Sequence, residues 1–234
     1  MMQKKLSILM INGFLFVQAF SQAITEDAIS VDKNLIQVET VTWLDSYDLK
    51  CNELEWDLPS ILLRYGVQSN IEMRIATNFE GKKHIHSMEV ARLGNIEAGF
   101  KLHILKGESF NLSALHHIIF PRNFETNEIN ASTSLIASED INEKIQIGCS
   151  VQYLFEKATN FNVNYSFVIY YNISNSLNVH IETFGDFFES NPTNNVDFGL
   201  DWVVSETKLI QAGMGTGLNE THYFVSAGFV WVIN

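Results

Sequence analysis

The residues of this chain that could do chemistry are ionisable side chains set at alternate positions within apolar segments. Because successive side chains of a β-strand point to opposite faces, residues two apart share a face. Charged groups gathered on one face of strands that enclose a space can select solutes by charge and shape, or can pair with one another and fill that space. Assigning faces strand by strand predicts an inward-facing set of Glu39, Arg64, Glu72, Arg74, Glu97, Lys101, His103, His117, His180, Glu182, Asp186, Asp197 and Asp201.

Two groups within this set are spaced for direct interaction. Arg64, Glu72 and Arg74 come from adjacent predicted strands, where facing side chains lie close enough to form a ladder of ion pairs. Glu97 and Lys101 lie four residues apart on the same face of one strand. Two interpretations stay open: a charged, water-filled path, or an interior in which arginine and glutamate interlock and close it.

No arrangement of residues predicts an enzyme. A serine nucleophile needs a base within hydrogen-bond reach and a third group that orients the base. The chain has neither a G-x-S-x-G motif nor a His and a Ser at matching spacing on strand ends. His84 and His86 precede Ser87, but they fall in a predicted loop, where a solvated pair of histidines is favoured over a weak metal site. We therefore expect no catalytic residue, no metal and no cofactor.

The elements that must position these side chains are β-strands with strict two-residue alternation. The last strand places Tyr223, Val225, Ala227, Phe229, Trp231 and Ile233 on one face and His222, Ser226 and Gly228 on the other. The same alternation predicts twelve strands, at residues 34–45, 53–66, 70–79, 94–105, 109–120, 129–138, 143–155, 161–172, 176–186, 195–204, 207–216 and 221–232. Strands of about 10 residues, apolar on one face and polar on the other, are typical of transmembrane β-barrels. The expected fold is all-β, an antiparallel transmembrane β-barrel of about twelve strands, with a soluble β-sandwich as the alternative.

The connections between strands also favour a barrel. Tight connections at 66–70, 106–108, 139–142, 173–175 and 205–206 alternate with longer ones at 47–52, 80–93, 121–128, 187–194 and 217–220. Outer-membrane barrels have short periplasmic turns at one rim and longer external loops at the other, and an even strand number returns both termini to the periplasmic side. Twelve strands lie between the ~8 whose interior side chains can fill and the 16–18 that leave an aqueous channel. The number of strands therefore does not distinguish a water-filled interior from a closed one.

Aromatic residues lie near the ends of the predicted strands on the outward face. They are Tyr65, Phe79, Phe100, Tyr153, Phe155, Phe161, Tyr171, Trp202, Tyr223 and Trp231. Aromatic rings at these positions suit the interfacial girdles of a membrane barrel.

The N-terminus has the pattern of a secretory signal peptide. Lys4 and Lys5 precede an apolar run at 6–17, and the small residues at 19–21 mark a cleavage site. The apolar run is too short for a membrane-spanning helix, which needs about 20 residues. We assign residues 1–21 to the signal peptide and 22–234 to the barrel. Because strands begin within about a dozen residues of the cleavage site, we expect no N-terminal plug domain.

Composition narrows the class of partner. The formal net charge is −12, and loss of the two signal-peptide lysines makes it about −14, so binding to nucleic acid is excluded. The chain has 17 Phe, 7 Tyr and 4 Trp against 3 Pro, which favours long strands. A mean hydropathy of +0.03 suits a barrel, which confines its apolar residues to alternate positions.

Several short motifs, in order along the chain, resemble those of one protein family. They are Leu62-Leu63-Arg64-Tyr65-Gly66 with 70–74, the stretch 97–101, His117 before Pro121, and the stretches 182–185, 197–199, 215–219 and 223–229. From about Leu35 to the end, the chain resembles the outer-membrane β-barrel transporter family filed under the meta-pathway of phenol degradation. The resemblance implies a Gram-negative outer membrane, and Gln22 after the cleavage site is similar to exports of Bacteroidota. Chains of this family tend to end on an aromatic residue that the barrel-assembly machinery reads, whereas here three residues follow Trp231.

These observations predict a protein of the cell outer membrane, in contact with lipid and inserted by the barrel-assembly machinery. The expected function is that of a passive transporter or channel for a small solute, with apolar and aromatic molecules among the candidates. The alternative is a closed, plugged barrel with a structural role or with external loops that bind a partner.

Overall fold

The structure is a computed structural model of the chain. It describes residues 25–47, 53–84, 87–88, 92–121, 129–156, 160–187, 192–219 and 222–233. The predicted signal peptide, residues 1–21, lies outside the described residues and stays a prediction. Within the described ranges, no helix has the length and apolar character needed to cross a membrane.

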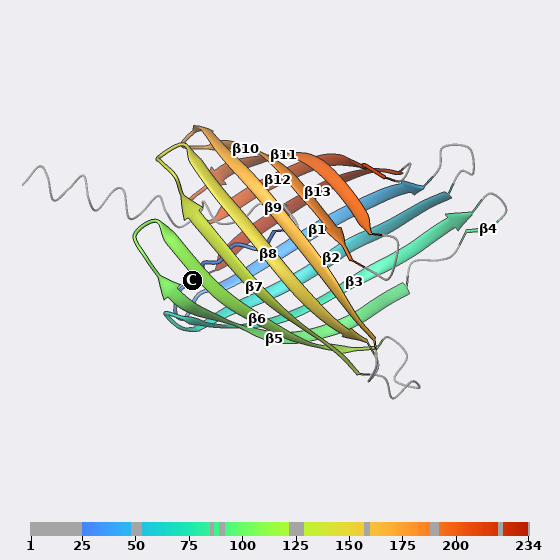
Figure 1. The fold of residues 1–234 in the computed structure, drawn as a ribbon, viewed down its shortest axis with the longest axis horizontal. Helices are drawn as coiled ribbons and strands as arrows, with labels where there is room; N and C mark the ends of the chain where they lie inside the picture. The colour runs from blue at the N-terminus through green and yellow to red at the C-terminus, as the bar shows by residue number, and fades with distance from the viewer. Residues whose placement is uncertain are drawn as a thin grey trace, which may run out of the picture.

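One antiparallel sheet contains all the strands and closes on itself (Figure 1). The strands are β1 (Ile36–Tyr47), β2 (Glu53–Gln68), β3 (Ile71–His84), β4 (Ser87–Met88), β5 (Arg92–Lys106), β6 (Phe110–Phe120), β7 (Asn130–Asp140), β8 (Ile145–Glu156), β9 (Asn160–Ser174), β10 (Leu177–Asp186), β11 (Thr193–Ser205), β12 (Lys208–Gly217) and β13 (His222–Ile233). β1 pairs with both β2 and β13, and this double pairing closes the barrel. The two-residue β4 pairs only with the end of β3, so twelve strands form the wall.

The twelve wall strands confirm the predicted all-β barrel, and each predicted range overlaps one of them. The prediction is wrong after residue 79, where we expected a loop over 80–93. Instead β3 continues to His84 and keeps its register with β2, pairing Glu80 with Asp57 and Lys83 with Leu54. The extension is polar, so it lacks the alternation by which the other strands were predicted.

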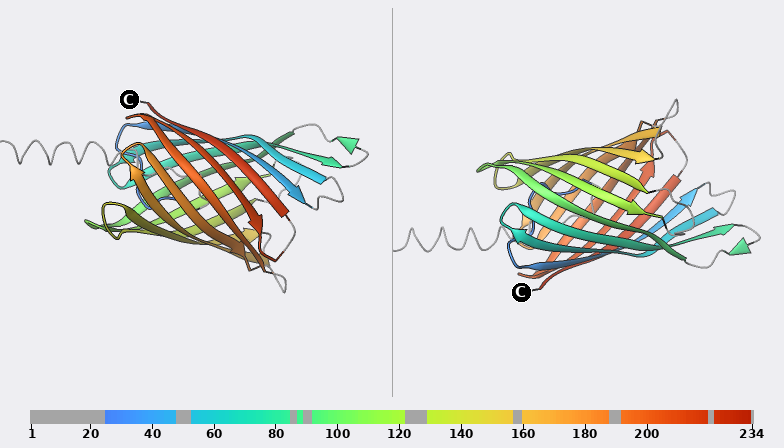
Figure 2. Two further views of the ribbon diagram at one scale, coloured as in Figure 1. Left: turned by 90° about the horizontal axis from the view of Figure 1, so that it is seen from above. Right: turned by 90° about the horizontal axis from the view of Figure 1, so that it is seen from below.

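The predicted alternation of short and long connections holds only in part, because β8 and β9 are separated by three residues and β12 and β13 by four. Two to four residues join β2 to β3, β5 to β6, β7 to β8, β9 to β10 and β11 to β12. All five turns lie at one rim, where β1 begins and β13 ends (Figures 1 and 2). The strands that form the wall are markedly tilted relative to the barrel axis. The longer connections, among them 121–129 and 187–192, lie at the other rim. Assignment of the short-turn rim to the periplasm stays a prediction.

Burial is inverted relative to a soluble protein. Among the described residues, twenty-four polar or charged side chains are buried, against eight apolar ones. The outer face carries large apolar side chains, including Phe198 at 62% and Leu135 at 53% exposure. Soluble proteins bury apolar residues and rarely bury charge without a partner. An apolar exterior around a polar interior is instead the arrangement of a barrel in lipid, and it disfavours the soluble sandwich.

The segment before β1 runs inside the barrel (Figure 1). Residues 25–31 contact the inner wall, and Ala28 lies fully buried against Leu115 and Ile136. We expected no N-terminal plug domain, and the sequence did not predict that a short irregular segment would enter the lumen. An extended chain covers about 3.3 Å per residue, so a segment of this length is enough to occupy part of the lumen without forming a domain.

The backbone of β2 holds the end of this segment. The Asn34 amide donates to the Gly66 carbonyl at 2.7 Å, and the Gly66 amide donates to the Leu35 carbonyl at 3.1 Å. Asn34 has a φ of 68°, a left-handed conformation that asparagine tolerates better than most residues. Gly66 is required here, because a Cβ atom at this position would lie 2.0 Å from the carbonyl oxygen of Asp32.

Candidate functional site

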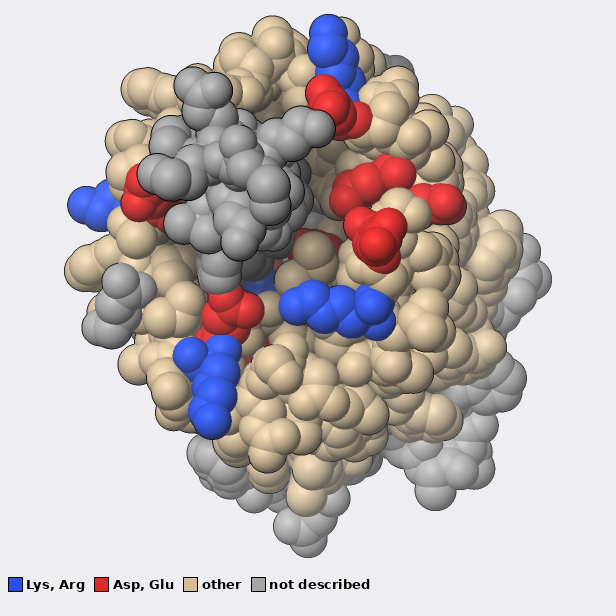
Figure 3. Space-filling view, turned by 90° about the vertical axis from the view of Figure 1, so that its left-hand side faces the viewer, with Lys and Arg blue, Asp and Glu red and all other residues tan. Residues whose placement is uncertain are grey.

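The candidate site is the polar interior of the barrel. The predicted inward-facing set lies there: nine members are buried, His117 is 9% exposed, and Glu39, Glu97 and Asp186 are partly buried. Seen from the short-turn rim, acidic and basic side chains surround a hollow at the end of the barrel (Figure 3). The set separates into a basic cluster on β1, β2, β3 and β5, a histidine–aspartate cluster on β10 and β11, and the pair of Glu97 and His117. The other three members bond residues outside the set: His103 bonds Asn111, Glu182 bonds Thr25 and Asp186 bonds Thr193.

The basic cluster is built on the β2–β3 hairpin. Antiparallel pairing places Arg64 directly opposite Arg74, and Glu72 lies two residues before Arg74 on the same face. Glu72 accepts two hydrogen bonds from Arg64, at 2.7 and 2.8 Å, and lies 3.6 Å from the Nε of Arg74. Glu39 of β1 accepts a further bond from Arg64 at 2.9 Å. The predicted ladder of ion pairs is confirmed.

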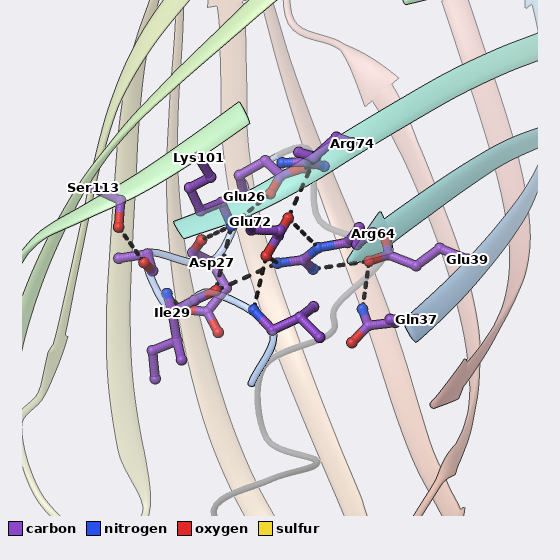
Figure 4. A network of polar contacts seen from close by, with 12 residues as sticks. Glu26, Asp27, Ile29, Gln37, Glu39, Arg64, Glu72, Arg74, Lys101 and Ser113 are labelled. Carbon is purple, nitrogen blue, oxygen red and sulfur yellow. Dashed lines mark hydrogen bonds and ion pairs between the residues drawn. The ribbon is translucent and has the colours of Figure 1, made fainter. Parts of the chain in front are cut away.

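The N-terminal segment supplies the remaining acidic group of this cluster (Figure 4). Glu26 accepts a hydrogen bond from Arg74 and lies 3.2 Å from the Nζ of Lys101. Lys101 also donates to the carbonyl oxygens of Asp27, at 2.7 Å, and of Ile29, at 3.4 Å. Sequence reasoning missed Glu26, because it lies outside every strand and is 75 positions from Lys101 along the chain.

Further hydrogen bonds fix the segment along the lumen. Thr25 donates to Glu182 through its amide at 2.6 Å and through its hydroxyl at 2.5 Å. At the other end, the amide of Val31 donates to Glu72 at 2.8 Å. Between them, Ser113 of β6 donates to the carbonyl oxygen of Ala28. The segment therefore bridges opposite walls of the barrel.

The two carboxyl groups of the segment have opposite electrostatic surroundings. Desolvation raises the pKa of Glu26, but the charges of Arg74 and Lys101 outweigh it and hold that pKa well below its ordinary value. Desolvation dominates at Asp27 and raises its pKa to about 6. Glu26 is therefore held ionised by the basic cluster, whereas at Asp27 the charges of Lys101 and Arg64 do not outweigh desolvation.

The histidine–aspartate cluster lies on β10 and β11. His180 is 3.9 Å from both Asp197 and Asp201, and Gln211 donates to Asp201 at 3.3 Å. Gly199 lies opposite His180 in the register and leaves room for the imidazole, since a Cβ there would lie 1.9 Å from that ring. The 3.9 Å separations are too long for hydrogen bonds. Of the residues that the structure describes, no three His, Cys, Asp or Glu side chains are grouped to hold a metal ion.

A cavity of about 400 Å³ extends from the N-terminal segment along the interior of the barrel. Glu26 lies at its surface, and most of the residues that line it are polar or charged. The lining includes Glu97, His117, Ser134, Ser150, Gln152, Asn164, Ser166, Asp186, Thr193 and Asn195, with Leu115, Ile136, Tyr165 and Phe184 as apolar or aromatic members. Glu97 and His117 lie 3.1 Å apart. This lining can form hydrogen bonds to a small molecule at many points and contains no nucleophile with a base to activate it.

The fold and the interior define the class: a closed, twelve-stranded antiparallel barrel of outer-membrane type. Solved structures of this class are similar to the chain. An outer membrane channel from Pseudomonas putida F1 matches with a TM-score of 0.68 at 9% identity, over 88% of this chain and 98% of that chain. KdgM porin in complex with disordered oligogalacturonate matches with a TM-score of 0.61 at 7% identity, over 85% and 99%.

The toluene transporter TodX from Pseudomonas putida is also similar, with a TM-score of 0.53 at 9% identity, over 92% of this chain and 99% of that chain. At such low identity these matches show a shared fold. No protein-family model matches the chain, and no curated protein matches it either.

Proposed function

We propose that this protein is a passive channel for a small solute in the outer membrane. The observation that carries the proposal is a closed barrel whose exterior is apolar and whose polar interior encloses a cavity of about 400 Å³. A closed barrel satisfies every backbone group in its wall, which allows strands to cross lipid. Groups along the interior can then hold a solute that has left bulk water.

The names of the structural neighbours do not select the solute. One names toluene and another names oligogalacturonate, an apolar and a charged molecule. Here the lining combines serine, asparagine and glutamine with Tyr165 and Phe184. We therefore favour a solute with polar groups, on an aromatic or another small frame, over a hydrocarbon without polar groups.

The remaining elements of the proposal come from the sequence. Export requires the predicted signal peptide, and insertion requires the barrel-assembly machinery, which would use Trp231 as the terminal aromatic residue. The phenol-pathway label and the Bacteroidota resemblance stay predictions. An enzymatic role is not proposed.

A specific observation supports the closed barrel as the second candidate. Residues 25–31 occupy part of the lumen and are hydrogen-bonded to opposite walls. If this segment is permanent, it blocks the path. If it can leave, the same barrel conducts.

Conductance in planar bilayers tests the proposal. We expect discrete current steps from the refolded protein, and larger steps from a variant that lacks residues 25–31. A shift in gel migration between unboiled and boiled samples controls for folding. A folded barrel that passes neither ions nor small solutes, with or without residues 25–31, would overturn the channel and leave the closed barrel.

A further inference from the structure

The N-terminal segment provides the acidic partner for two buried cations of the wall. We propose that Arg74 and Lys101 form a binding site for the carboxylate of a small anionic solute, and that Glu26 occupies this site as an internal substitute. The inference rests on the proposed channel and names the chemical class of its solute. Three observations carry it.

The first observation is that Lys101 depends on the segment for its partners. Its side chain is fully buried. Among the described residues, its hydrogen bonds and its ion pair all go to the segment: to Glu26, to the carbonyl of Asp27 and to the carbonyl of Ile29. A buried ammonium group without an acceptor is costly. When the segment leaves, another anion is therefore favoured at Lys101.

The second observation is that Arg74 has donors to spare. It is 3% exposed, and its Nη2 atom bonds Glu26. Its Nε and Nη1 atoms have no hydrogen-bond partner among the described residues, and the nearest carboxylate oxygen, on Glu72, is 3.6 Å from Nε. A guanidinium group binds a carboxylate best through two parallel hydrogen bonds. Glu26, held by its own backbone, uses only one of the nitrogens, whereas a free carboxylate can use two.

The third observation is the charge of the wall itself. Arg64, Arg74 and Lys101 face two wall carboxylates, Glu39 and Glu72, so the wall cluster carries one excess positive charge without Glu26. A neutral solute would leave that charge uncompensated in a buried place, but a carboxylate would balance it. The site therefore selects for a single negative charge.

The position of Glu26 makes the site reachable. Glu26 lies at the surface of the cavity and is bonded to Arg74 and Lys101, which do not line it, so displacement of Glu26 would open these two side chains to a solute in the cavity. For this exchange the segment must release the hydrogen bonds and the buried alanine contact that fix it. It can do so without opening the wall, because residues 25–31 belong to no strand.

Calorimetric titration of the detergent-folded protein tests the site without requiring transport. The probe is benzoate, and benzamide is the uncharged control of the same shape. A site that is free only about a tenth of the time binds its ligand about tenfold more weakly. We therefore expect Glu26→Gln to strengthen benzoate binding by about tenfold and to leave benzamide binding unchanged.

Two further variants make the test specific. Asp27→Asn removes the neighbouring carboxylate, whose hydrogen bond among the described residues comes from the amide of Ile29, and should change benzoate affinity far less than Glu26→Gln. Lys101→Met and Arg74→Gln, each in the Glu26→Gln background, should abolish benzoate binding. Gel-shift assays confirm that each variant folds, and a variant that does not fold is replaced by Arg74→Lys, which should bind more weakly than Glu26→Gln alone.

The proposal would be overturned if folded wild-type protein and the Glu26→Gln variant bound benzoate with equal affinity. It would also be overturned if benzamide bound as tightly as benzoate. The conductance measurement separates this result from failure of the channel itself. If the barrel conducts current but does not bind benzoate, the proposed channel is supported and the proposed carboxylate site is excluded. If benzoate binds in a way that requires Lys101 but the barrel conducts no current, the carboxylate site is supported and the channel is excluded.

Discussion

At the scale of single residues, the interior is stabilised by a buried network in which Arg64, Arg74 and Lys101 are each paired with a carboxylate. Arg64 is 2% exposed and is bonded by Glu72 and Glu39. Removing one partner of such a pair costs much more than the pair contributes, because it leaves the other charge desolvated. We therefore expect a single substitution to lower the stability of the barrel most where the residue is buried and bonds more than one member of the network.

Glu72→Gln tests this sensitivity. Glu72 is fully buried and holds Arg64 and the amide of Val31, while Glu39 still pairs with Arg64 in the variant. We expect a loss of about 3 kcal/mol in the free energy of unfolding, at the low end for a broken buried pair. Urea unfolding in lipid vesicles, followed by tryptophan fluorescence, measures the loss.

Glu97→Gln is the matched control for that substitution. Its side chain is 36% exposed and, within the part of the chain that the structure describes, pairs with His117 alone. Because solvent screens such a pair, the loss should stay below about 1 kcal/mol. Equal losses in the two variants would mean that the network around Arg64 contributes no more than a solvent-screened pair.

At the scale of elements, the N-terminal segment depends on a close approach to β2. The segment lies flat on the strand at Gly66, where the nearest atoms to a Cβ would be backbone atoms of Asp32 and Val31. Backbone atoms cannot rotate away as a side chain does. The absence of a side chain at this one position therefore allows the segment to enter the lumen where it meets Arg74.

Gly66→Ala should lift the segment from the wall without removing any charge. The new methyl group would lie 2.0 Å from the Asp32 carbonyl oxygen, so residues before β1 must shift. We expect a folded barrel with larger single-channel conductance than the wild type, in the same direction as deletion of residues 25–31. Planar-bilayer recordings measure the change.

Gly228→Ala serves as the control for an added methyl group. A Cβ there would lie 3.1 Å from the nearest atom, the Thr40 carbonyl oxygen, which a small local adjustment can accommodate. Its conductance should match that of the wild type. If folded Gly66→Ala also conducts like the wild type, the close approach does not hold the segment in the path.

At the scale of the whole molecule, the closed wall and its apolar exterior decide where the protein can reside. Outward-facing residues such as Tyr153, Trp202 and Tyr223 are 44–51% exposed, which leaves large aromatic rings in contact with the surroundings. In water such a surface would drive aggregation. In a bilayer it contacts acyl chains and headgroups, and each of the twelve wall strands is paired on both sides.

The cost of a charge on the outer face distinguishes lipid from water around the barrel. Leu135 lies midway along β7 and is 53% exposed. Leu135→Arg should make folding into vesicles less favourable by about 2–4 kcal/mol, as expected near the bilayer midplane. Equilibrium folding titrations into vesicles provide the measurement.

Ile141→Arg is the control at a different depth. Ile141 is 52% exposed, like Leu135, but it lies just beyond the end of β7 at the short-turn rim. The cost there should fall to about 0–1 kcal/mol. Small and equal costs at the two positions would indicate a barrel surrounded by water.

The sequence by itself determined the elements, their number and the facing of their side chains. Two-residue alternation is a local property of the strand, so it could be read from positions such as Phe198 and Leu200 against Asp197 and Asp201. It also anticipated the ladder of Arg64, Glu72 and Arg74, because neighbouring strands are consecutive in the chain. Where alternation ceased, at residues 80–84, the prediction of the strand ended too early.

Only the tertiary structure decided what occupies the interior. Glu26 meets Arg74 and Lys101 across 48 and 75 positions of sequence, and Thr25 meets Glu182 across 157. The segment has no periodic pattern, since irregular backbone satisfies its hydrogen bonds through whichever wall atoms it reaches. Its position follows from closure of the barrel, which brings distant strands around one space. Closure also buries an excess positive charge on the wall, and Glu26 of the segment balances that charge.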